Sequence, residues 1–238
     1  MPKTKSSEPT ALPAAAQSGV SAVNRALQIL DALADGSDGT SLAALSKRTG
    51  LYKSTILRLA ESLIAFGLVE RSAEGVFRLG SDLIRLGELA KRTRRSSDDI
   101  LAILRNLTEQ TGESSTYYIR RQEHRLALFR VDSPKTVRDH IRAGDLLPLD
   151  RGAAGHIFRE FSKGKAEPNV FAIKVSHGER DPEVAAVAGP VFSGGALAGV
   201  LSISGPRHRF NAAAIRKFST LLTEQCEWLS RALDMRRP

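Results

Sequence analysis

The chain has almost no cysteine and no long apolar run. Cys226 is the only cysteine among its 238 residues, so no intrachain disulfide can form, and we expect a reducing, cytoplasmic environment. No apolar stretch approaches the roughly 20 residues that a membrane-spanning helix needs, so no membrane partner is expected. Residues 1–19 lack the apolar segment of a secretory signal, and we interpret them as a disordered tail.

The sequence also lacks the usual signs of catalysis. Its five histidines lie far apart, without the H-x-x-x-H or mixed Cys/His spacing of a metal site. No Gly-Lys-Ser/Thr phosphate-binding loop occurs. An enzyme would instead need clustered polar groups with shifted pKa values, which scattered histidines and carboxylates do not suggest. We therefore expect no metal, no cofactor and no enzyme activity.

Basic residues outnumber acidic ones. The 35 Lys and Arg residues and the 26 Asp and Glu residues give a net charge of +9, which favours a polyanionic partner such as nucleic acid or anionic lipid. Solubility alone is the alternative explanation. From Gly39 to Ala60 there is no acidic residue, whereas Lys47, Arg48, Lys53 and Arg58 all occur, so nothing in this stretch would repel phosphate. The length exceeds the roughly 100–200 residues of one domain and favours two domains.

Residues 20–80 carry the pattern of three helices followed by a small hairpin. We expect helices from Ser21, as a possible N-cap, to Gly36, from Ser41, as a cap, to Gly50, and from near Tyr52 to Gly67, with two short strands after them. A Gly-centred turn of about four residues separates the second and third helices. This order predicts a winged helix-turn-helix domain that binds double-stranded DNA.

The third helix supplies the expected DNA contacts. Lys53, Ser54, Thr55 and Arg58 lie on its first turns, opposite the apolar stripe, where a helix in the major groove presents side chains to bases. A solvated helix face is the alternative reading of these residues. Around the helix we expect contacts to phosphates, which position the protein without specifying sequence, from Arg25, Ser41, Arg71 and Arg78.

The rest of the chain predicts a linker helix and a second domain of mixed helices and strands. Residues 81–96 read as an exposed linker helix that ends in a basic run, and residues 97–238 as an α+β domain with a largely antiparallel sheet. Helices are expected at 98–112 and 211–233. The expected strands are 115–121, 125–131, 137–143, 170–175, 183–192 and 197–204.

Small residues in the second domain suggest a ligand site. Gly152, Ala153, Ala154 and Gly155 open a helix, which leaves room and free N–H groups for an anionic ligand, although a close-packed turn explains them equally well. Ser202 and Ser204 share one face of a strand, so both hydroxyls could enter one cavity. Ordinary exposed serines are the alternative there.

Several stretches resemble the IclR-type bacterial transcriptional regulators: "SAVNRALQILDAL", "SLAALSKRTGLYKSTILRLAESLIAFGLVER", "FRLGSDLIRLGELA", "LPLDRGAAG", "GERDPEVAAVAGPVF" and "LSISGPRHRF". The resemblance implies a winged helix-turn-helix, a linker helix and a GAF-like effector domain that binds small, often carboxylate or aromatic, metabolites and tunes operator binding. It also implies dimers through the N-terminal domains, and often tetramers.

The resemblance assigns roles to individual residues. The recognition-helix positions match Lys53, Ser54, Thr55 and Arg58, and Glu179 matches an acidic pocket position. The other positions that match pocket-lining residues of the family are Leu149, Ala153, Ala154, Gly155, Ala186, Ser202 and Ser204.

The chain also departs from the family pattern. Residues 159–177 form a shorter stretch than the family has before the "GERDPE" motif, and Glu183 stands where a glycine is usual. The C-terminal domain is therefore a shortened one. Two interpretations stay open: a regulator that senses a small molecule, and a constitutive DNA-binding protein whose C-terminal domain only oligomerises.

Overall fold

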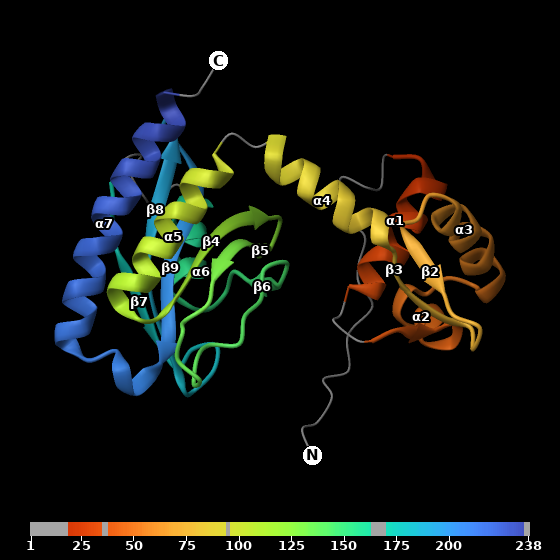
Figure 1. The fold of residues 1–238 in the computed structure, drawn as a ribbon, viewed down its shortest axis with the longest axis horizontal. Helices are drawn as coiled ribbons and strands as arrows, with labels where there is room; N and C mark the ends of the chain where they lie inside the picture. The colour runs from red at the N-terminus through yellow and green to blue at the C-terminus, as the bar shows by residue number, and fades with distance from the viewer. Residues whose placement is uncertain (1–18, 35–37, 94–95, 163–169, 236–238) are drawn as a thin grey trace. The chain divides into compact units, whose positions relative to one another are not determined.

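The computed structural model describes residues 19–34, 38–93, 96–162 and 170–235 (Figure 1). The chain divides into two compact units, Met1–Arg94 and Arg95–Pro238, which are considered separately below. Nearly all of the expected N-terminal tail and the expected helix end at Gly36 lie outside the described residues.

The described residues of the first unit form four helices and a small sheet. The helices are α1 (Ser21–Leu33), α2 (Leu42–Thr49), α3 (Lys53–Ala65) and α4 (Ser81–Thr93). The strands β1 (Thr40–Ser41), β2 (Val69–Arg71) and β3 (Val76–Leu79) form an antiparallel sheet in the order β1-β3-β2. The order of three helices and a hairpin confirms the predicted winged helix-turn-helix; β1 was not expected.

Local sequence signals explain the turn between α2 and α3. The Ser41 hydroxyl accepts a hydrogen bond from Ala44 N–H at 3.3 Å and caps α2 as expected. Gly50 ends α2 with a left-handed φ of 70°, a conformation that glycine adopts without strain. At α1 the expected cap is wrong: Ser21 is already the first helical residue, and Val20 precedes it without a side-chain cap. Packing of Ile29, Leu45, Ile56 and Phe77 in the core outweighs that missing bond.

The second unit is a six-stranded antiparallel sheet with helices on both faces. The strands β4 (Ser114–Arg121), β5 (His124–Val131), β6 (Leu146–Pro148), β7 (Lys174–His177), β8 (Val184–Ser193) and β9 (Ala196–Pro206) pair in the order β6-β5-β4-β9-β8-β7. The long helices α5 (Ser97–Thr111) and α7 (Ala212–Met235) lie side by side on one face (Figure 1). The shorter helix α6 (Ala153–Ser162) packs on β7, β8 and β9. The mixed α/β class is as expected.

Separate apolar clusters fill the two sides of this sheet. Leu104, Leu107, Leu222 and Leu229 of α5 and α7 meet one face, together with Cys226. Burial raises the pKa of the Cys226 thiol, which is completely enclosed. The other face packs against α6, chiefly through residues of "AAGHIF".

One expected strand is wrong. Residues 137–143 form no strand, and the sheet instead gains β6, only three residues long, from Leu146. The backbone of this irregular segment is held by side chains: Arg130 donates to the Asp139 carbonyl at 2.8 Å, and Arg209 donates to the Val137 carbonyl at 3.0 Å. Asp139 and Ile141 alternate with exposed residues because both side chains pack against neighbouring elements. The segment does not pair with a strand of the sheet. A second strand, expected at 170–175, begins only at Lys174.

Gly199 of β9 lies too close to a buried ring to accept a side chain. A Cβ at this position would lie 2.3 Å from Tyr117 Oη, and the Tyr117 ring has little room to move because it is buried in the core. We expect Gly199→Ala to lower the free energy of unfolding of the second unit by about 1–3 kcal/mol through overpacking. Urea unfolding followed by the fluorescence of Trp228, the only tryptophan, measures this.

Gly87 provides the matched control, since a Cβ there would meet nothing within 4 Å on α4. Gly87→Ala should leave the Trp228 transition unchanged and raise helix stability by about 0.5–1 kcal/mol. If Gly199→Ala and the unmodified protein unfold at the same urea concentration, the packing argument is contradicted.

Candidate nucleic-acid interface and candidate ligand cavity

The helix α3 presents a polar face to solvent. Lys53, Ser54 and Arg58 are exposed, Thr55 is half-buried, and the opposite face buries Ile56, Ala60 and Leu63 in the core. The apolar spacing thus fixes which side chains point outward. The first turn of α3 contains no acidic residue, so the positive end of the helix dipole and the Lys53 ammonium are not neutralised there. This end of α3 is suited to an anion such as a phosphate.

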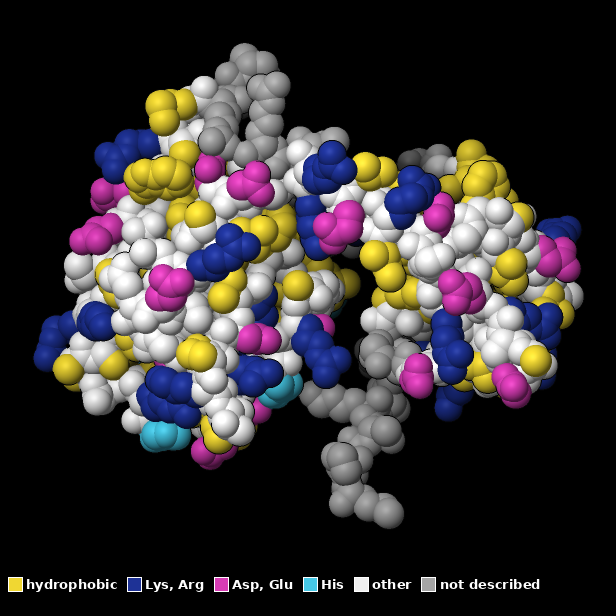
Figure 2. Space-filling model, in the orientation of Figure 1, with side chains coloured by type: hydrophobic (Ala, Val, Ile, Leu, Met, Phe, Trp, Pro, Cys, Tyr) yellow, Lys and Arg dark blue, Asp and Glu magenta, His cyan; other side chains and the backbone are white. Residues whose placement is uncertain are grey.

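The other four residues expected to contact DNA differ in whether their side chains already have contacts within the unit. Arg25 is exposed on α1, and the Ser41 hydroxyl is already used as a helix cap. The Arg71 guanidinium lies over the Phe77 ring at 5.2 Å, and Arg78 Nε donates to the Asp38 carbonyl at 2.8 Å. Both wing arginines remain exposed but are oriented by these contacts. Figure 2 shows Lys and Arg side chains on the surface of both units.

Two neighbouring residues change the sequence-based picture of this surface. Arg48, counted in the acid-free stretch, donates to the Ala32 carbonyl at 3.0 Å and to Thr40 Oγ1 at 3.3 Å, so its guanidinium is held inside the unit. Tyr52, directly before α3, is 84% exposed. The sequence indicated Tyr52 only as a helix boundary; its exposure beside Lys53 is a feature that the structure adds.

A small cavity lies in the second unit between the sheet, α6 and the irregular segment before β6. Its volume is about 30 Å³. Five of the eight expected effector contacts line it: Ala153, Ala154, Ala186, Ser202 and Ser204. The sheet register explains the two serines, since Ser202 and Ser204 stand two residues apart on β9 and therefore share one face.

The remaining expected contacts surround the start of α6 without lining the cavity. A Cβ on Gly155 would lie 2.7 Å from the Leu149 carbonyl, so this glycine permits a close-packed turn. Glu179 accepts hydrogen bonds from Gly152 N–H at 2.8 Å and from His156 Nε2 at 2.7 Å. Burial alone would raise the pKa of Glu179, but these two hydrogen bonds lower it below its ordinary value.

Two N–H groups at the start of α6 have internal partners. Gly152 N–H donates to Glu179 Oε2 at 2.8 Å, and Ala153 N–H donates to Ser176 Oγ at 3.0 Å. These two N–H groups are therefore already bound to the chain's own side chains.

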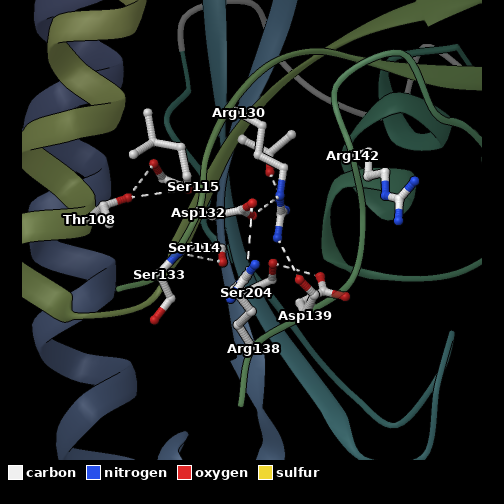
Figure 3. Close-up of polar contacts among 12 residues, drawn as sticks. Thr108, Ser114, Ser115, Arg130, Asp132, Ser133, Arg138, Asp139, Arg142 and Ser204 are labelled. Atoms are coloured by element: carbon white, nitrogen blue, oxygen red, sulfur yellow. Dashed lines mark hydrogen bonds and ion pairs between the residues drawn. The ribbon is translucent and has the colours of Figure 1, made fainter. Parts of the chain in front are cut away.

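Charged residues that sequence reasoning missed line the same cavity. Arg125 is 3% exposed, Asp139 is 1% exposed, and Arg180 reaches the cavity from the loop before β8. Asp139 accepts a hydrogen bond from Ser204 Oγ at 2.8 Å (Figure 3). It accepts another from Arg180 Nη2. No local pattern signals this grouping, because Arg125 sits in an ordinary strand sequence and Asp139 sits where a strand was expected.

The described residues contain no group of three or more His, Cys, Asp and Glu side chains that could hold a metal ion. Within the same residues, no helix is both long and apolar enough to cross a membrane.

Known proteins similar to this chain are transcriptional regulators. The IclR helix-turn-helix domain family matches residues 22–73. The regulator BhcR of Paracoccus denitrificans is 26% identical, and the alignment covers 92% of this chain and 89% of BhcR. The repressor YiaJ of Escherichia coli is 30% identical over 60% of this chain, which spans only 51% of YiaJ.

Solved structures show the same fold. An IclR regulator from Alicyclobacillus acidocaldarius superposes with a TM-score of 0.77 at 23% identity, covering 90% of this chain and 98% of the other. An IclR homolog from Microbacterium hydrocarbonoxydans, complexed with 4-hydroxybenzoate, gives a TM-score of 0.70 at 18% identity, covering 89% of this chain and 100% of the other. The first unit therefore contains an IclR-type helix-turn-helix domain, and over most of its length the chain is similar in sequence and in fold to IclR-family transcriptional regulators.

Proposed function

We propose that the chain binds a pseudo-palindromic operator as a homodimer and that a small anionic molecule in the second unit changes its operator affinity. One α3 helix enters the major groove of each half-site. The observation that carries this proposal is the outward face of α3, with Lys53, Ser54 and Arg58 exposed at a helix end that has no acidic residue.

Contacts of two kinds are expected at the operator. Lys53, Ser54, Thr55 and Arg58 contact base edges and adjacent phosphates, and Arg25, Ser41, Arg71 and Arg78 contact phosphates around them. Exposure of Arg25, Arg71 and Arg78 supports this assignment. The Arg78 bond to the Asp38 carbonyl would keep this wing side chain extended before DNA binds.

The homodimer is supported by apolar side chains that the first unit leaves exposed. Val20, directly before α1, is 69% exposed, and Val23 and Leu27 of α1 are each 53% exposed. Their spacing of three and four residues puts all three on one stripe, and exposed apolar patches of this kind mark association surfaces. Figure 2 shows that hydrophobic side chains, in yellow, reach the surface of this unit. Further assembly to a homotetramer would involve the second unit.

The effector role is supported by the position and the charges of the cavity. An IclR homolog of the same fold was solved with 4-hydroxybenzoate, an aromatic carboxylate. The cavity of about 30 Å³ is far smaller than the roughly 300–1,000 Å³ of typical ligand pockets, so an aromatic acid would enter only if lining residues moved. An effector that binds one arrangement better than the other would shift the population toward it.

The same small volume favours the competing candidate, a constitutive DNA-binding protein whose second unit only oligomerises. The two candidates share every expectation about DNA and differ only in whether a ligand changes affinity.

The double variant Lys53→Ala/Arg58→Ala should lose at least about thirtyfold in affinity for DNA from the upstream region of the gene, because two side chains that read bases would be lost. The measurement is a fluorescence anisotropy titration against random DNA of equal length, repeated at several salt concentrations.

The control for that titration is Arg105→Ala/Arg216→Ala, which removes two exposed positive charges from the second unit. Both double variants carry the same net charge, so equal loss of affinity would reduce the interaction to general electrostatics. Operator affinity retained in Lys53→Ala/Arg58→Ala would contradict the assignment of α3 as the recognition helix.

The variant Leu27→Glu should turn the dimer into a folded monomer, since a carboxylate placed in the α1 stripe would be buried without a partner. Sedimentation velocity at micromolar protein gives the oligomeric state. Ala22→Glu, which adds the same charge at an exposed position in the first turn of α1 outside the stripe, should leave the dimer intact. A monomeric unmodified protein, or a dimer in both variants, would exclude this interface.

A screen of small aliphatic and aromatic carboxylates, 4-hydroxybenzoate included, tests the effector role. We expect at least one compound to raise the thermal midpoint of the second unit and to change operator affinity about fivefold or more. If a broad screen yields no compound with both effects, the constitutive candidate is correct.

A further inference from the structure

The Asp139 carboxylate is buried although its backbone belongs to no helix or strand. The side chain is 0% exposed, whereas five preceding residues, 134–138, are all exposed. In this segment Asp139 and Ile141 are buried, whereas Arg142 is exposed. Figure 3 shows Asp139 beside Ser204 and Arg142 pointing away from them. Burial of a carboxylate is unfavourable unless its lost hydration is replaced, so its new partners decide the conformation of the segment.

Those partners form a site for a carboxylate. Ser204 Oγ donates to one Asp139 oxygen at 2.8 Å, and Arg180 Nη2 donates to the other. Both partners lie far away in the sequence, on β9 and on the loop before β8. An oxygen pair held between a hydroxyl and a guanidinium is the arrangement in which proteins bind free carboxylates.

The charges around the cavity are not balanced by Asp139 alone. Arg125 and Arg180 both line it, whereas Asp139 is the only carboxylate among the lining residues. The Arg125 guanidinium donates to the carbonyls of Pro148 and Arg151, and its buried Nε has no hydrogen-bond partner among the described residues. Burial lowers the pKa of Arg125.

The Arg125 guanidinium also lies against the start of α6. A Cβ on Gly152 would be 3.2 Å from Arg125 Nη2, and one on Gly155 would be 2.9 Å from Nη1. The Arg125 guanidinium thus lies beside the positive end of the α6 helix dipole, and two positive charges close together favour a nearby anion. By contrast, the buried Glu113 carboxylate of the same unit is paired with both Lys135 and Arg209.

We propose that Asp139 is a tethered ligand: its carboxylate occupies an anion site, formed with Arg180 and Ser204, that also takes the carboxylate of a small free acid. The inference rests on the proposed effector role of this cavity and identifies what an effector must displace. The remaining volume of about 30 Å³ has room for about one water molecule, so a free acid and the Asp139 side chain cannot occupy the site together.

Displacement would move the Asp139 carboxylate out of the site without detaching the segment. Arg209 would still hold the Val137 carbonyl and Arg130 the Asp139 carbonyl, so the backbone at these two points would stay in place. A tethered group competes at a high effective concentration, so acetate, which offers little beyond its carboxylate, will not displace it at millimolar concentration. An effector must gain affinity from further contacts. Removal of the Asp139 side chain eliminates this competition.

The experiment is chemical rescue of Asp139→Ala in the full-length chain. Sodium acetate should raise the thermal midpoint of this variant by about 3 °C or more above equal sodium chloride, with saturation, because acetate fills the vacated site. The unmodified protein should shift by less than about 1 °C, as should Asp139→Asn, in which an amide still fills the space.

The control Asp132→Ala removes an exposed carboxylate directly after β5, seven residues before Asp139, where Asp132 accepts a hydrogen bond from Arg130 Nε at 2.8 Å. It should show no specific acetate effect. If Asp139→Ala does not fold in chloride, its refolding from urea is compared in acetate and in chloride; recovery in acetate alone is the expected result.

Equal behaviour of Asp139→Ala in acetate and chloride would overturn the proposal and leave Asp139 as a structural ion-pair partner. Rescue of Asp139→Asn or Asp132→Ala to the same extent would overturn it too, because the effect would then be general. These experiments measure the stability or refolding of the protein in the absence of DNA. Failure of rescue with intact operator binding therefore rejects only the tethered ligand, and loss of operator recognition rejects only the proposed DNA contact.

Discussion

The central strand β9 connects the core of the second unit with its cavity, through the alternation of side chains across a pleated strand. It pairs with β4 on one side and β8 on the other, so its register is fixed from both directions. Leu201 and Ile203 join the apolar cluster beneath α5 and α7, whereas Ser202 and Ser204 face the cavity. A slip of one residue would expose the hydroxyls to the core and the apolar side chains to the cavity. Packing on one face therefore sets the chemistry on the other.

The two units use charge in different ways. In the first unit, the positive side chains proposed to contact DNA remain in solvent, where they are available to a polyanion and where salt screens them. In the second unit, several arginines are buried around the cavity, where each interaction is stronger because water is excluded. Arg125, Arg130 and Arg180 illustrate this: their donors reach carbonyls, a hydroxyl and carboxylates inside the unit. The net basic character of the sequence therefore conceals two separate roles.

The parts of the structure that depend on local pattern could be predicted from the sequence. The helices of the first unit, the cap at Ser41 and the left-handed Gly50 follow from signals within a few residues. The shared face of Ser202 and Ser204 follows from the two-residue period alone. What could not be predicted depends on contacts between distant segments. Asp139 meets a residue 41 positions later and another 65 positions later, and alternation in its own segment gave a false strand.

The enclosed Cys226 has a practical consequence for spectroscopy. Its thiol is 0% accessible and is the only one in the sequence. The native protein therefore behaves toward maleimides and nitroxide reagents as if it had no cysteine. One cysteine introduced on the outward face of a helix would be the single attachment point in each copy. Distances between spin labels could then be measured in the assembled protein without first replacing a core residue.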